Sequence, residues 1–191
     1  MADLARPRDA DALLRVLDAY SRDPMGEARP LTAEARACLI PALRRVPNAL
    51  VFLAWAQVAP GPDSASRLVP AVGSGPAANR GRSVEPAPCS QPVGAAVCFV
   101  GFSTFRARGL INVHDLAVLP DWRGYGVGTR LLGAVEGLAR RRGYCKITLE
   151  ARLDNPAQRL YRRSGYGAGA VGEPGDGANV QYAFLEKRLD D

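Results

Sequence analysis

Residues 123–129 read Arg-Gly-Tyr-Gly-Val-Gly-Thr, and this stretch is the most informative part of the chain. It follows an apolar, strand-like run, residues 110–119, and opens a helix whose apolar residues recur at helical spacing. Glycines at alternate positions let a backbone turn sharply and approach a ligand without Cβ atoms in the way. A helix N-terminus adds unpaired N–H groups and the positive end of the helix dipole. The stretch therefore predicts a loop that binds a phosphate-bearing ligand, such as a pyrophosphate.

Three kinds of phosphate loop compete for this stretch. A nucleoside-triphosphate loop ends in Lys followed by Ser or Thr, and this chain has no lysine there. The dinucleotide fingerprint Gly-x-Gly-x-x-Gly comes directly after its strand, whereas here residues 120–123 intervene and the glycines read Gly-x-Gly-x-Gly. Glu150 does stand roughly 20 residues downstream, where that fold places a ribose-binding acid. An NAD-dependent oxidoreductase of Rossmann type is therefore an alternative hypothesis.

The third kind of loop has the pattern Arg/Gln-x-x-Gly-x-Gly/Ala, which Arg123, Gly126 and Gly128 satisfy. Residues 113–166 resemble the GCN5-related N-acetyltransferase (GNAT) superfamily, in which this loop holds the pyrophosphate of acetyl-coenzyme A. Several blocks carry the resemblance in the same order: His114-Asp115-Leu116-Ala117-Val118, Pro120-Asp121-Trp122-Arg123-Gly124, Ile147-Thr148-Leu149-Glu150-Ala151-Arg152, Asp154-Asn155-Pro156, Leu160-Tyr161 and Gly165-Tyr166. Such an ordered set is far more specific than a lone glycine motif.

The resemblance implies an α/β fold with a mixed, mostly antiparallel central sheet flanked by helices, in which two central parallel strands splay apart. It also implies acetyl-coenzyme A as cosubstrate, with the pantetheine arm lying between the splayed strands like an added strand. The cofactor-binding residues that it implies are the backbone of Leu116, Ala117 and Val118, the loop residues Arg123, Gly124, Tyr125, Gly126, Val127, Gly128 and Thr129, and Asn155.

The chemistry of the family needs a proton acceptor and a proton donor. A lysine-like amine with a pKa of about 10.4 is neutral in roughly one molecule in 2,500 at pH 7, a handicap of about 4.6 kcal/mol. By resemblance Glu150 is the leading candidate for the base, with Asp115 and His114 as alternatives, of which strand alternation lets only one face the cleft. A structural ion pair with an arginine is the competing explanation for Glu150. Tyr161 resembles the tyrosine that protonates the departing thiolate of coenzyme A.

One spacing departs from the family pattern. Family members place the tyrosine seven residues after the asparagine, but Asn155 and Tyr161 are six apart. One residue corresponds to about 100° of helix rotation. Either the helix begins differently and Tyr161 keeps its place, or Asn155 loses its contact with coenzyme A and Asp154 substitutes for it.

These observations predict an N-acetyltransferase that moves an acetyl group to a primary amine by direct attack in a ternary complex. Cys145 has no visible histidine partner, which argues against an acetyl-cysteine intermediate. A non-catalytic module that binds coenzyme A is a further alternative. Asp115 and Glu150 favour a cationic acceptor, and a small molecule, a peptide terminus or a lysine side chain would each fit.

Composition sets outer limits on the class of protein. The chain has 191 residues, of which 47% are hydrophobic and 23% charged, enough for one sizeable core. We expect one N-acetyltransferase domain over residues 1–191, in a soluble cytoplasmic protein, because no apolar run approaches the roughly 20 residues that cross a bilayer. Four scattered cysteines without Cys-x-x-Cys spacing, and a single histidine, predict buried free thiols and no metal site.

The net charge of +6 raises the question of nucleic-acid binding. Nearly all basic residues are arginines, and the densest cluster, residues 140–142, lies at the end of the predicted glycine-loop helix, where cations favour the dipole. Aromatic residues do not interleave with that cluster, so a solvated face is the preferred interpretation. We therefore expect an amine acceptor as partner, neither nucleic acid nor membrane, and leave a homodimer open.

Hydrophobic periodicity gives the order of elements. Helices are predicted at 9–20, from Thr32 onward with a kink or split at Pro41, at 126–142 and at 156–164. Strands are predicted at 49–58, 93–105, 110–119, 144–153 and 180–189. Residues 59–92 are rich in Pro, Gly, Ser and Ala without periodicity, which predicts a disordered insertion in a hairpin connection.

Overall fold

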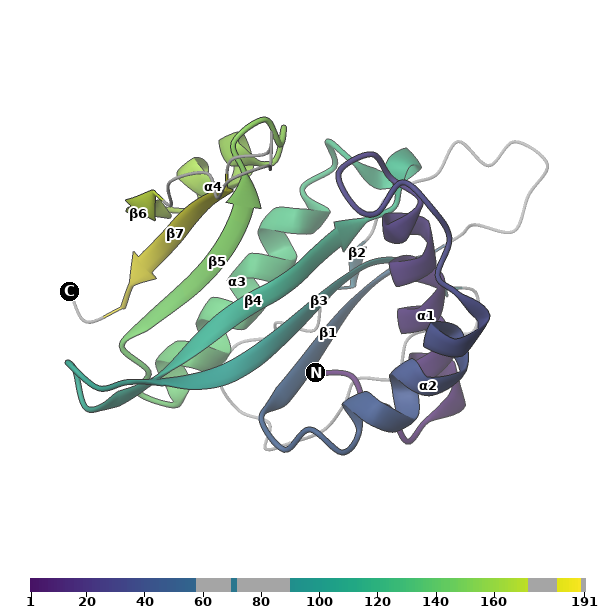
Figure 1. The fold of residues 1–191 in the computed structure, drawn as a ribbon, viewed down its shortest axis with the longest axis horizontal. Helices are drawn as coiled ribbons and strands as arrows, with labels where there is room; N and C mark the ends of the chain where they lie inside the picture. The colour runs from purple at the N-terminus through teal and green to yellow at the C-terminus, as the bar shows by residue number, and fades with distance from the viewer. Residues whose placement is uncertain (58–69, 72–89, 172–181, 190–191) are drawn as a thin grey trace.

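A twisted sheet forms the centre of the molecule (Figure 1). The computed structural model describes residues 1–57, 70–71, 90–171 and 182–189. Seven strands in the order β2-β1-β3-β4-β5-β7-β6 make up the sheet. Their bounds are Ala49–Gln57 for β1, Pro70–Ala71 for β2, Ser90–Ser103 for β3, Arg108–Val118 for β4, Lys146–Arg152 for β5, Gly167–Val171 for β6 and Tyr182–Arg188 for β7.

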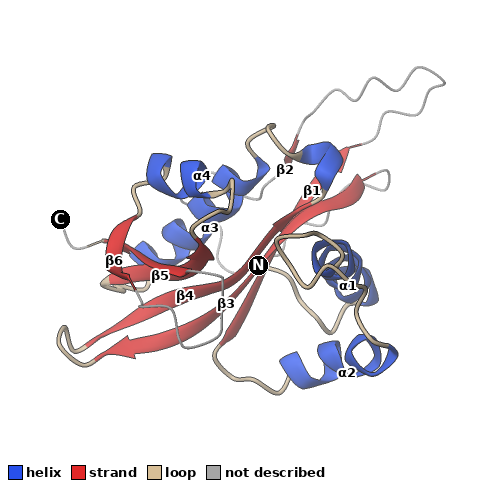
Figure 2. Cartoon of the chain, turned by 45° about the horizontal axis from the view of Figure 1, so that its top comes forward, coloured by secondary structure: helices blue, strands red, loops and turns tan. Residues whose placement is uncertain are grey.

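Helices cover both faces of this sheet. α1 and α2 lie on one face, and α3 and α4 lie on the other (Figures 1 and 2). Their bounds are Pro7–Ser21 for α1, Ala33–Leu43 for α2, Val127–Arg141 for α3 and Gln158–Arg163 for α4, with a short 3-10 turn, η1, at Pro120–Trp122. Two hydrophobic clusters follow from this arrangement, because each sheet face packs against its own helices.

The larger cluster lies between the sheet and α3. Leu131 and Val135, spaced one turn apart on α3, are fully buried against residues of the central strands. On the other face, Leu13 and Val16 of α1 are equally buried and pack toward Ala95 of β3. Alternate residues of β3 therefore enter opposite clusters, as the pleat of a strand requires.

Strand pairing distinguishes between the candidate folds. All neighbouring pairs in the sheet are antiparallel except β4 and β5, which run parallel, with η1 and α3 between them in sequence. This confirms the predicted mixed, mostly antiparallel α/β fold. A Rossmann fold needs a largely parallel sheet built from successive strand-helix-strand units. The oxidoreductase alternative is therefore not favoured.

Most predicted elements are confirmed, with shifted ends. The expected split of α2 is wrong, since the helix runs unbroken to Leu43 and Pro41 falls in its last turn, where few backbone bonds remain to be broken. Thr32 caps that helix as predicted, accepting the N–H of Ala35 at 3.1 Å. Most of the predicted insertion lies outside the described residues, but residues 70–71 pair with β1 and residues 90–92 belong to β3, so these were wrongly assigned to a loop.

Candidate active site

The parallel strands β4 and β5 separate half-way along their length. Residues 110–113 of β4 pair with residues 146–149 of β5, and no pairing continues beyond them. The N–H of Leu119 donates to Val93 of β3 at 2.9 Å, so by strand alternation the backbone groups of Leu116 and Val118 face β5. The splay therefore exposes polar backbone at these two positions, which is where an added, strand-like ligand would bond. The same alternation directs the backbone of Ala117 to β3.

The glycine loop follows β4 after the short turn η1. Gly124 and Gly126 have φ angles of 80° and 78°, a left-handed conformation that favours glycine, and a Cβ at either would meet nothing within 4 Å. The first helical bond runs from the N–H of Arg130 to Gly126, and the N–H groups of residues 124–129 have no partner in the described parts of the chain. An open shell of amides at the helix N-terminus results, which suits an anionic group.

Gly128 serves a different purpose from the other two glycines. It lies inside α3, and a Cβ there would come within 2.8 Å of the Leu160 side chain on α4. The sequence pattern assigned all three glycines to ligand approach. For Gly128 the observed contact is instead the packing of α3 against α4.

Arg123, the first residue of the loop pattern, is engaged by the protein itself. Its Nη2 lies 2.7 Å from Asp23 Oδ2, and its Nε donates to the carbonyl of Val118 at 3.1 Å. The side chain is half exposed. Asp23 was not identified from the sequence, because it precedes Arg123 by 100 positions and carries no motif.

Tyr161 lies on α4, at the edge of the larger hydrophobic cluster. The residue is 6% exposed, and its ring meets Tyr166 edge to face with centroids 6.3 Å apart. Burial, with a smaller contribution from Tyr20 of α1, raises the pKa of Tyr161 to about 12. The phenol therefore keeps its proton at neutral pH and can act as a donor.

A β-bulge changes the expected orientation of His114 and Asp115. The register of β3 and β4 shifts where Val97 pairs with Asp115 and Cys98 with Val113, which leaves His114 as the extra residue. The His114 ring contacts Phe99, which belongs to the α1 side of the sheet, and Asp115 interacts with Tyr20 of α1. Both side chains therefore face the same side. The expectation that only one of them could is wrong, because it assumed unbroken alternation.

The carboxyl of Asp115 is half-buried beside the splay. Burial raises its pKa, and the neighbouring His114 opposes that rise. The Asp115 carboxyl consequently holds a proton more tightly than an exposed aspartate does, a property shared by many catalytic bases.

Glu150 lies on the same face, at the first position of β5 beyond the paired region. Thr148, two residues earlier on that face, accepts a hydrogen bond from Asn112 of β4 at 3.2 Å. The Glu150 side chain is exposed, and it forms no ion pair with any described residue. The structural ion pair considered for Glu150 is thus not observed within that part of the chain.

The comparison with known families decides the assignment. Residues 85–166 match the model of the acetyltransferase (GNAT) family. This match confirms the GNAT resemblance over residues 85–166, which make up less than half of the chain. Over 78 residues it is 32% identical to an uncharacterized N-acetyltransferase of Methanocaldococcus jannaschii. That match covers 40% of the chain and 34% of the relative, so it spans about a third of the curated protein's length.

Solved GNAT structures share the fold over nearly the whole chain. A protein of Desulfovibrio desulfuricans assigned to this family has a TM-score of 0.60 at 18% identity, covering 96% of this chain and 94% of that one. An aminoglycoside 6'-N-acetyltransferase complexed with coenzyme A has a TM-score of 0.64 at 15% identity, covering 98% and 94%. A NatC complex bound to Gag peptide and coenzyme A has a TM-score of 0.61 at 16% identity, covering 98% and 95%. At these identities the likeness concerns the fold alone.

Asn155, at the position of the GNAT asparagine, hydrogen-bonds to the backbone of its own segment. Asn155 lies before α4, and its side-chain oxygen accepts the N–H of Ala157 at 2.8 Å, forming an Asx-type turn. Asp154 accepts two hydrogen bonds from Arg152, of 2.9 and 2.7 Å, and its substitution for Asn155 stays a prediction. α4 begins only at Gln158, so the six-residue spacing from Asn155 to Tyr161 includes two residues before the helix. The contact of Asn155 with coenzyme A stays a prediction.

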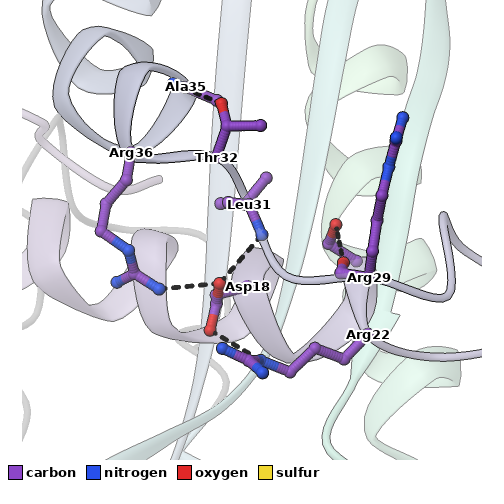
Figure 3. A network of polar contacts seen from close by, with 8 residues as sticks. Asp18, Arg22, Arg29, Leu31, Thr32, Ala35 and Arg36 are labelled. Atoms are coloured by element: carbon purple, nitrogen blue, oxygen red, sulfur yellow. Dashed lines mark hydrogen bonds and ion pairs between the residues drawn. The ribbon is translucent and has the colours of Figure 1, made fainter.

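An ion-pair network holds the connection between α1 and α2 next to this site. One Asp18 oxygen lies 2.7 Å from Arg36 and accepts the N–H of Leu31 at 3.1 Å, and the other lies 3.1 Å from Arg22 (Figure 3). The Ser21 hydroxyl donates to the carbonyl of Arg29 at 2.7 Å. These bonds hold the end of the connection that lies next to α2 against α1.

The two buried cysteines of the described residues are poorly suited to an acetyl relay. Cys98 and Cys145 are buried, and burial, with a smaller contribution from Asp115, raises the pKa of Cys98 to about 12. Cys38 is exposed on α2, contrary to the expectation of buried thiols, and Cys89 lies outside the described residues. In the described ranges we find no group of three or more His, Cys, Asp and Glu side chains that could hold a metal, and no helix able to span a bilayer.

Proposed function

We propose that the protein transfers an acetyl group from acetyl-coenzyme A to a primary amine by direct attack in a ternary complex. One observation carries the proposal: the β4–β5 splay opens beside the amides of residues 124–129, and Tyr161 is buried in the hydrophobic cluster that includes Leu149, the last paired residue of β5. The amides would bind the diphosphate, and the backbone of Leu116 and Val118 would bond the pantetheine arm. Bound in this way, the cosubstrate supplies an activated thioester.

Side chains of the protein then remove a proton from the attacking amine and supply one to the leaving thiolate. The amine nitrogen bonds to the carbonyl carbon as the carbon–sulfur bond breaks. A carboxylate at the mouth of the splay removes a proton from the attacking nitrogen. Tyr161 gives its proton to the departing sulfur, so that coenzyme A leaves as a thiol, and the phenolate then regains a proton from solvent. With a free thiol pKa of about 8.5 and a Tyr161 pKa of about 12 this transfer is uphill, so it depends on the apolar surroundings that disfavour a free thiolate.

Two carboxylates compete for the role of base. Glu150 is exposed and matches the family position, whereas Asp115 is half-buried with a raised pKa. Burial raises the pKa of Tyr20 on α1, and the charge of Asp115 contributes to that rise. Tyr20 in turn makes a small contribution to the raised pKa of Tyr161 on α4. The raised pKa of Asp115 favours this residue as the base, and we assign to Glu150 the attraction of a cationic amine.

A free-thiol release assay tests this function. Acetyl-coenzyme A is offered with polyamines, amino acids, aminoglycosides and peptides in turn, and release above the amine-free rate is the expected result with one or more acceptors. Thermal protection by coenzyme A without any release would instead support a non-catalytic binding module. Thermal protection by NAD and not by coenzyme A would instead support the NAD-dependent oxidoreductase.

Asp115→Asn is expected to stabilise the protein at neutral pH while lowering kcat. A raised pKa means that the carboxyl favours folding only below its unfolded value of about 3.9 and disfavours folding as pH rises through the folded value. We expect a Tm gain of about 2–4 °C at pH 7.5, roughly 1 kcal/mol, that shrinks toward zero near pH 4. Thermal unfolding across a pH series measures the gain.

Glu186→Gln provides a control of opposite sign. The hydrogen bond from Lys146, the largest of several contributions, lowers the pKa of Glu186, so its carboxylate stabilises the fold above its unfolded pKa. The variant should lose stability at pH 7.5 and match the wild type in acid. A Tm gain for Asp115→Asn that stayed constant with pH would contradict the assigned cause.

A further inference from the structure

One ion pair ties the connection between α1 and α2 to the glycine loop. Asp23 Oδ2 lies 2.7 Å from Arg123 Nη2, and Asp23 Oδ1 accepts the N–H of Met25 at 2.8 Å. The Asp23 side chain is only 13% exposed. The Met25 hydrogen bond and then the Arg123 side chain lower the pKa of Asp23, so it is an anion at neutral pH.

Arg123 joins three parts of the site. Its Nη2 meets Asp23 of the connection, its Nε donates to the Val118 carbonyl at the splay, and its backbone begins the glycine loop. An isolated surface ion pair contributes only about 0–1 kcal/mol to stability. Positioning, more than stability, is therefore what this pair can contribute.

The connection can transmit such positioning because it is internally braced. The network of Asp18 holds Leu31 and Arg36, and Ser21 holds Arg29, so the end next to α2 is braced (Figure 3), while Asp23 near the α1 end is held by Arg123. Tyr20 lies two residues before this stretch, and burial raises its pKa, to which the charges of Asp115 and Asp23 contribute. A restraint applied at Asp23 therefore acts next to the side chains proposed for chemistry.

We propose that Asp23 is a positioning residue that couples occupancy of the glycine loop to order in the connection between α1 and α2. The inference rests on the proposed function, since it assumes that coenzyme A binds the amides of residues 124–129. Binding there immobilises Arg123, and Arg123 then holds Asp23 and the connection in place. By reciprocity the ordered connection strengthens coenzyme A binding by the same factor.

Hydrogen exchange with and without coenzyme A tests the coupling without requiring turnover. In the wild type, coenzyme A should slow exchange at residues 124–129 and, at least fivefold, at residues 22–31. In Asp23→Asn the first protection should remain while the second falls below twofold. Glu27→Gln is the matched control, because it removes the same charge from the same connection but breaks only the exposed Arg29 pair. It should keep both protections.

A double-mutant cycle tests whether Arg123 transmits the coupling from the glycine loop to Asp23. Arg123→Gln keeps a residue that the GNAT loop pattern accepts, so coenzyme A should still protect residues 124–129 while the protection of residues 22–31 is lost. Adding Asp23→Asn to that variant should change nothing further. With an acceptor from the amine panel, Asp23→Asn should raise the KM of the amine several-fold and leave kcat within twofold.

The outcomes separate the two proposals. Absence of wild-type protection at residues 124–129 overturns the proposed function and the coupling with it. Protection at residues 124–129 together with undiminished protection of residues 22–31 in Asp23→Asn overturns the coupling alone. Additive losses in the double variant overturn Arg123 as the carrier and favour independent effects of the two side chains.

Discussion

Gly126→Asp is expected to lower the affinity for coenzyme A by about 100-fold, roughly 3 kcal/mol, in a protein that folds normally. Gly126 is the N-cap of α3 and has a φ of 78°, a conformation that aspartate tolerates better than most residues. Its carboxylate would accept the free N–H groups of the first helical turn and place a negative charge where the diphosphate binds. The same change thus favours the helix and opposes the ligand. Isothermal titration with coenzyme A measures the loss.

Two companion variants separate charge from backbone strain. Gly126→Asn has nearly the same shape and the same tolerance of a left-handed φ but carries no charge. It should retain affinity within about tenfold, and the Asp variant alone should be strongly sensitive to salt. Gly133→Glu adds a carboxylate to the same helix at an exposed position where a Cβ meets nothing within 4 Å. It should bind coenzyme A as the wild type does, and equal losses in all three variants would contradict a diphosphate site at Gly126.

The glycine loop could be predicted from sequence because its information is contiguous. Residues 110–130 contain the strand, the turn and the helix start, and the periodicity of α3 is regular enough to place its buried face. The family pattern then supplied the splayed parallel pair, which local propensity could not. Local sequence determines the strand end, the turn and the helix start because each of them depends on residues within one or two turns.

Long-range contacts were beyond such reasoning. The pair of Asp23 and Arg123 depends on two loops 100 residues apart meeting at one end of the sheet. The bulge opposite Val97 and Cys98, which turns His114 and Asp115 to one side, depends on how two strands fit together rather than on either alone. The contact of Gly128 with Leu160 likewise requires knowledge of how α3 packs on α4.

Tyr161→Phe is expected to reduce kcat by about 10²- to 10⁴-fold while the dissociation constant of coenzyme A changes less than about threefold. The hydroxyl is the only group lost, and the ring keeps its buried packing against Tyr166. With a pKa of about 12, Tyr161 stays protonated throughout the usual assay range, so the wild-type rate should show no loss from this residue up to about pH 10. Single-turnover and steady-state rates with the best acceptor measure the effect.

Tyr166→Phe is the matched control for that measurement. It removes a second buried phenol from the same aromatic pair, and the Tyr166 hydroxyl has no hydrogen-bond partner among the described residues. Burial raises the pKa of Tyr166 as well, so proton availability alone does not distinguish the two tyrosines. Their electrostatic neighbours differ, because Tyr20 of α1 contributes to the raised pKa of Tyr161 and not to that of Tyr166. A wild-type rate in Tyr161→Phe, or an equal loss in both variants, would therefore exclude Tyr161 as the specific proton donor to the thiolate.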